Sequence, residues 1–122
     1  MMKLTGVAVL VVGVIALGPH PDLSAAQTPD PAKVAAGKTA YDTQKCGTCH
    51  QIAGKGGKLA GALDDVGKRL TAADIKKWFT NPTEMEAKLK DKPKMLMSTF
   101  LKQHKLTDAD VEALTAYMQT LK

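Results

Sequence analysis

The alternation of apolar and polar positions along the chain predicts a fold made of short helices. Apolar residues recur at helical spacing over residues 32–43, directly after Asp30-Pro31, which pairs an N-cap residue with a proline suited to the first helical turn. Thr71 and Thr107 each precede an aspartate by three residues, a variant of the capping box, and each opens a new apolar stripe. No segment sustains the alternation of a half-buried strand. We therefore expect an all-α domain with about four short helices.

The segments between these helices carry the signals of irregular structure. The helix that begins at Thr71 is expected to end at Asn81-Pro82, because proline disfavours helical backbone in the residue before it. Residues 51–62 hold four glycines and two lysines without periodicity, and we read them as a loop. Residues 92–100 form a second irregular segment, which lies between two predicted helices.

The N-terminal residues have the pattern of an export signal. A positive start at Lys3 is followed by an apolar run from Leu4 to Gly18 and by the small residues Ser24-Ala25-Ala26. We expect cleavage after Ala26, so that residues 1–26 are a signal peptide and residues 27–122 form one domain. The run is shorter than the roughly 20 residues of a membrane span, which makes an uncleaved membrane anchor the less favoured alternative.

Cys46-Gly47-Thr48-Cys49-His50 is the strongest chemical signal in the chain, because C-x-x-C-H is the attachment signature of a c-type haem. Thiols three residues apart lie on one side of a helical turn, where both can bond to one porphyrin. His50 follows on the same side and can offer an imidazole nitrogen to the iron. A redox-active dithiol or a simple disulfide is the alternative. The sequence has no other cysteine, so we expect one covalent haem c and its iron.

A second axial ligand decides between electron transfer and chemistry on bound ligands. Met118 falls in the apolar stripe of the last helix and is expected in the core, and Met85 lies in a charged stretch without supporting context. Met95 and Met97 lie in the irregular segment 92–100, far enough from the haem motif to approach the other face of the ring. His104, flanked by polar residues, is a rival that we expect to be exposed.

The charge of the chain points to an acidic protein partner. Lysine and arginine total 17 against 12 aspartates and glutamates, for a net charge of +5. Arg69 is the only arginine, which argues against dedicated phosphate recognition, and an exported protein has little access to nucleic acid. We expect no nucleic-acid partner and docking of acidic redox proteins through lysines near the haem edge. The lysines near the haem motif and the methionines are Lys45, Lys55, Lys58, Lys88, Lys90, Lys92 and Lys94.

Together these motifs resemble a small class I c-type cytochrome of the bacterial periplasm, over essentially the whole of residues 27–122. In that family a glycine followed four positions later by an aromatic residue lets the first helix cross the last. A conserved L-x-x-V-G-x-R stretch follows the haem motif, and a tryptophan packs against the haem. The positions of this chain that match these features are Gly37, Tyr41, Leu114, Tyr117, Leu63–Arg69 and Trp78.

The resemblance implies the cytochrome c fold, with short helices wrapped around one covalently bound haem, and it implies a ligand set. Cys46 and Cys49 would hold the haem and His50 would bind the iron. The family's M-P-x-F motif, aligned on Phe100, selects Met97 as the second ligand, with Met95 as the fallback and Ser98 in place of the usual proline. Gly61 stands where a prolyl carbonyl normally accepts a hydrogen bond from the haem-binding histidine. Trp78 completes the predicted haem pocket.

The function implied is that of a periplasmic one-electron carrier that is not itself an enzyme. With histidine and methionine on the iron, no coordination site is left open for a substrate. Two alternatives remain: the haem c subunit of a periplasmic oxidoreductase complex, and a gas-binding or peroxidatic haem protein in which neither methionine binds iron. The first has the same site, so the sequence does not separate it from a free carrier.

Overall fold

A computed structural model of the chain describes Gly18 and residues 28–122. The predicted signal peptide and its cleavage point at Ala26 lie outside the described residues, apart from Gly18. Within the described part, no helix combines the length and the apolar character needed to cross a membrane.

The described chain is helical, as predicted, with one small hairpin. The expected number of about four helices is too low: of the six α-helices in the described residues, α2 has four residues and α4 has six, which leaves little periodicity in the sequence. The segment read as a loop contains two paired antiparallel strands, in which Gln51 faces Gly56 and Ile52 faces Lys55. The elements are α1 (Pro31–Thr43), the 3₁₀ turn η1 (Cys46–Thr48), β1 (Gln51–Ile52), β2 (Lys55–Gly56), α2 (Val66–Arg69), α3 (Ala72–Thr80), α4 (Pro82–Ala87), α5 (Met97–Gln103) and α6 (Asp108–Thr120).

The N-terminal caps read from the sequence are present at three helices. The Asp30 side chain accepts a hydrogen bond of 2.8 Å from the backbone N–H of Ala32 at the start of α1. Thr71 accepts from the N–H of Asp74 at the start of α3. Thr107 and Asp110 form both bonds of a capping box at the start of α6. Each such cap contributes about 1 kcal/mol, because it satisfies an N–H group that the helix leaves without a partner.

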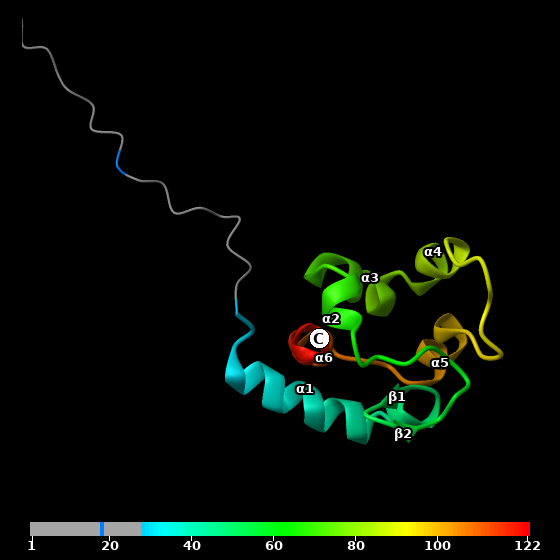
Figure 1. Cartoon of the computed structure of the whole chain (residues 1–122), viewed down its shortest axis with the longest axis horizontal. Coiled ribbons are helices and arrows are strands. Elements are labelled where there is room, and N and C mark those ends of the chain that lie inside the picture. The colour runs from blue at the N-terminus through cyan, green and yellow to red at the C-terminus, as the bar shows by residue number, and fades with distance from the viewer. Residues whose placement is uncertain (1–17, 19–27) are drawn as a thin grey trace, which may run out of the picture.

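Helices α1 and α6 cross in close contact at the centre of the fold (Figure 1). Gly37 makes the crossing possible, because a Cβ atom there would overlap the backbone carbonyl of Ala113 and the Cβ of Tyr117. One helical turn later, the rings of Tyr41 and Tyr117 meet edge to face with centroids 6.0 Å apart. The expected crossing of the first and last helices is therefore confirmed.

The core lies where α6 meets α1, α2 and α3, while α4 and α5 pack mainly on each other and on the end of α3 (Figure 1). Leu114 of α6 is completely buried at the centre. Met118 is also buried there, as expected from its place in the apolar stripe. Met85 is only 7% exposed, because α4, which the sequence did not reveal, turns it inward, and it does not line the cavity described below. The buried residues of the central cluster are Ala40, Tyr41, Val66, Ile75, Leu114 and Met118.

Candidate functional site

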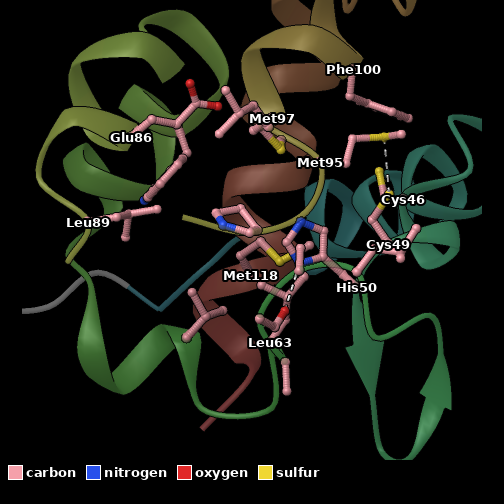
Figure 2. Close-up of a pocket in the computed structure, with 18 of the residues that line it drawn as sticks. Cys46, Cys49, His50, Leu63, Glu86, Leu89, Met95, Met97, Phe100 and Met118 are labelled. Atoms are coloured by element: carbon pink, nitrogen blue, oxygen red, sulfur yellow. Dashed lines mark hydrogen bonds between the residues drawn. The ribbon is translucent and has the colours of Figure 1, made fainter. Parts of the chain in front are cut away.

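A cavity of about 670 Å³ lies between the core and the pair α4–α5. Every α-helix and the turn η1 contribute to its wall, and most of the side chains that line it are apolar. Figure 2 shows the two cysteines on one side of this cavity and Glu86 and Leu89 on the other. The volume falls within the range of about 300–1,000 Å³ found for cofactor sites, and it is large for a domain of this size.

Cys46, Cys49 and His50 are brought to one side of the cavity by a tight turn. Lys45 has a left-handed backbone (φ 60°) that ends the run of α1, and η1 begins at the next residue. The N–H groups of Cys49 and His50 then both donate to the carbonyl of Cys46, at 3.2 and 3.1 Å. All three side chains line the cavity, and both cysteines are free thiols. The local helical turn therefore presents two thiols and an imidazole to one space.

The acidity of Cys46 argues against the alternative of a redox-active dithiol. Burial raises the pKa of the Cys46 thiol to about 11, so the group is neutral at physiological pH. Redox-active and metal-binding cysteines instead have lowered pKa values, because the thiolate is the reactive form. A neutral Cys46 thiol beside an apolar cavity suits attachment to an apolar group.

His50 is held in a defined orientation. Its Nδ1 lies 2.8 Å from the carbonyl oxygen of Gly61, the residue singled out in the sequence for this contact. Since a carbonyl can only accept, Nδ1 carries the proton and Nε2 is left with a free lone pair, the tautomer that binds a metal. The hydroxyl of Tyr41 donates to the backbone carbonyl of His50 at 3.3 Å, which ties the haem motif to α1.

The two candidate methionines lie in the same cavity wall but in different settings. Met97 is the first residue of α5 and is half-buried, so the expectation that it belongs to an irregular segment is wrong. Met95 precedes the helix, is 44% exposed, and has its Sδ 3.9 Å from the Sγ of Cys49. Both line the cavity. The Met95 thioether therefore points toward the side of the cavity that carries the cysteines.

The other residues considered in the sequence fall into two groups. Trp78 of α3 and Met118 of α6 line the cavity. His104 does not; its ring stacks on that of Phe100, with centroids 4.0 Å apart and planes at 9°. His104 is only half-buried and its Nδ1 lies 3.2 Å from the Phe100 carbonyl, at the C-terminal end of α5.

Glu86 is the residue of the site that the sequence analysis missed. It is 5% exposed and its side chain lies in the wall of the cavity. Its two carboxylate oxygens accept hydrogen bonds from the N–H and the hydroxyl of Ser98, at 2.7 and 2.8 Å. No local sequence signal marks this pair, because Glu86 and Ser98 are twelve residues apart and lie on different helices.

The lysines near the site differ in their surroundings. Lys58, Lys92 and Lys94 are exposed and line the mouth of the cavity. Lys88 instead forms an ion pair with Glu84, at 3.1 Å. The uncompensated positive charge at the cavity therefore comes mainly from the loops on either side of it.

This donor set fits a covalently attached haem. The cavity supplies an apolar wall, two free thiols with the required spacing, and an imidazole whose orientation is fixed by the Gly61 carbonyl. Met97 and Met95 add soft thioethers, which are typical second ligands of haem iron.

Comparisons with known proteins agree with this geometry. The family model for cytochrome c matches residues 34–122. An engineered cytochrome c from Rhodothermus marinus has a similar structure, with a TM-score of 0.56 over 85% of this chain and 90% of that one, at 22% sequence identity. At that identity the likeness shows a shared fold. No curated protein sequence is significantly similar to the chain.

Proposed function

The chain belongs to the cytochrome c family, and we propose that it works as an exported one-electron carrier with a histidine and a methionine on the haem iron. As a member of this family it carries a covalently attached haem c, which supports haem-based electron transfer. The observation that supports the proposal best is the meeting of an oriented imidazole and the Met97 thioether in one apolar cavity beside two free thiols.

Five residues of the cavity have a proposed role at the haem. Cys46 and Cys49 would hold the haem by thioether bonds, and His50 would bind its iron through Nε2 while the Gly61 carbonyl fixes the imidazole ring. Met97 would supply a thioether as the second ligand of the iron. Once bound, the haem supplies a centre that gains and loses one electron. The soft sulfur of Met97 favours ferrous iron and raises the reduction potential, and the apolar wall excludes water.

Trp78 and the loop lysines are proposed to contact groups at the periphery of the site, namely a haem propionate and the redox partner. Trp78 lines the cavity from α3, and we assign its indole N–H to a propionate of the haem. Lys58, Lys92 and Lys94 lie at the mouth of the cavity, where an electron leaves by the shortest path. Their positive charge attracts acidic redox partners and speeds encounter without tight binding, which suits a carrier that must also dissociate. Haem attachment outside the cytoplasm and the predicted signal peptide both point to the periplasm.

The choice of Met97 is tested by two matched substitutions. Met97→Ala is expected to abolish the sulfur-to-iron absorption band, open the iron to carbon monoxide and lower the reduction potential, because the only thioether on the iron is gone. Met95→Ala is the control and should leave all three unchanged. Visible spectra and potentiometry of the haem-loaded protein measure these effects. If the Met95 change alone removes the band, Met95 is the ligand. If neither change affects the spectrum, the protein is not a methionine-ligated carrier.

A further inference from the structure

The carboxylate of Glu86 is buried at the haem cavity without a cationic partner. Its side chain is 5% exposed, and no ion pair in the described chain includes it. A carboxylate removed from water is costly unless its oxygens are satisfied. Here Oε1 accepts from the Ser98 N–H and Oε2 from the Ser98 hydroxyl, at 2.7 and 2.8 Å. These two charge-assisted bonds are what keeps Glu86 in place.

The same two bonds fix the residue that follows Met97. In the described chain, none of the backbone N–H groups of residues 90–97 donates a hydrogen bond to another backbone group. Backbone hydrogen bonds donated by this stretch therefore do not fix its position between α4 and α5. The first donor after it is the Ser98 N–H, and its acceptor is Glu86. The Glu86–Ser98 contact thus defines where the start of α5 lies relative to α4, on the side of the cavity where Figure 2 shows Met97.

Ser98 is suited to this contact by its chemistry. It has a backbone N–H and a hydroxyl, both of which donate to the carboxylate, whereas a proline at this position would have neither. Rigidity that proline would give through its ring is here given by a bidentate hydrogen bond between two helices. In this chain the contact that fixes Ser98 comes from a side chain twelve residues away.

We infer that Glu86 is a positioning residue for the haem ligand: through Ser98 it holds Met97 at the iron, and its buried charge lowers the reduction potential. The inference rests on the proposed function, in which Met97 is the ligand. The second effect follows because a nearby negative charge at low dielectric favours ferric over ferrous iron. The two effects are separable, since hydrogen bonding and charge can be changed independently at one position.

Three variants of the full haem-loaded protein separate them. Glu86→Ala removes both bonds, and the sulfur-to-iron band should weaken while the ferric protein binds imidazole about tenfold more tightly or better. Glu86→Gln keeps hydrogen-bonding groups, since its amide oxygen can accept from the Ser98 N–H and its amide nitrogen can donate to the hydroxyl. The band should then stay near its normal strength while the reduction potential rises. Glu84→Ala is the control: it removes an exposed carboxylate from the same helix and should change neither band nor imidazole binding.

The outcomes decide the inference in each direction. If Glu86→Ala retains the normal band and imidazole affinity, or changes them no more than Glu84→Ala, the positioning role is wrong. If Glu86→Gln leaves the potential unchanged, the electrostatic role is wrong. Met97→Ala serves as the reference, because if it preserves the band then the ligand assignment fails, whatever Glu86 does. Should Glu86→Ala not load haem, Ser98→Ala replaces it: loss of the hydroxyl bond alone should give a smaller increase in imidazole affinity, and no increase overturns the inference.

Discussion

Replacing Gly37 by alanine should destabilise the protein, although alanine is the better helix former. Gly37 lies inside α1, where this change alone favours the helix by about 1 kcal/mol. The added methyl, however, would lie 2.6 Å from the carbonyl carbon of Ala113 and 2.7 Å from the Cβ of Tyr117, and would overlap the Ala113 oxygen. None of these atoms can rotate away, so α1 and α6 must separate. Overpacking of this kind costs about 3 kcal/mol at its upper range, which leaves a net loss of about 2 kcal/mol.

Guanidinium unfolding of the haem-loaded protein, followed by circular dichroism, measures this loss. Ala36→Gly is the matched control: Ala36 is the exposed neighbour in the same helix, so glycine there should cost about 1 kcal/mol from helix propensity alone. Both variants should therefore be less stable than the parent, for opposite reasons. A Gly37→Ala protein that is more stable by about 1 kcal/mol would show that the two helices do not approach closely, and would refute the reasoning.

Two further predictions concern charge and pH. The double change Lys92→Glu and Lys94→Glu should slow electron transfer to an acidic partner far more than the double change Lys33→Glu and Lys38→Glu on α1. The rate of the parent protein should fall steeply as salt is added, because charge attraction is screened over about 8 Å at physiological ionic strength. Equal losses of rate from both pairs would contradict docking at the cavity mouth. Burial raises the pKa of Tyr41 to about 12, so its neutral form stabilises the fold fully below pH ~10, and this contribution, up to about 2 kcal/mol, is lost as pH rises toward 12. Unfolding free energies measured across that window should fall more steeply for the parent than for Tyr41→Phe, and parallel curves would refute the assignment.

The parts of the fold that could be predicted from the sequence are those that depend on residues close together along the chain. The caps at Asp30, Thr71 and Thr107 satisfy N–H groups within three residues of themselves, so a short window contains both partners. The helix crossing at Gly37 is not a local contact, but it could still be predicted, because only glycine allows so close an approach and a family pattern marks its position. The turn that gathers the thiols and His50 is likewise a single local motif.

The parts that the sequence did not predict depend on contacts between distant segments. Met85 and Glu86 lie in a charged stretch, and their burial results from the packing of α4 against α3 and α5. The hairpin after the haem motif has only two residues in each strand, too few to show alternation. Asn81-Pro82 was read as the end of one helix, whereas Pro82 also occupies the first turn of the next, where its missing N–H is harmless.

The position of Glu86 links the two halves of this structure to the proposed function. The central cluster around α6 packs against α1, α2 and α3, while α4 and α5 lie across a cavity from it and contact mainly each other and α3. In that outer half, apolar side chains facing the cavity gain burial only from a group that fills it. The Glu86–Ser98 bonds join α4 to α5, so we expect a group that fills the cavity to stabilise both helices together. In the proposed carrier, His50 is tied to α1 through Tyr41, whereas Met97 begins α5 on the side of the cavity formed by α4 and α5. Glu86 is therefore the place where a single substitution should loosen the methionine without disturbing the histidine.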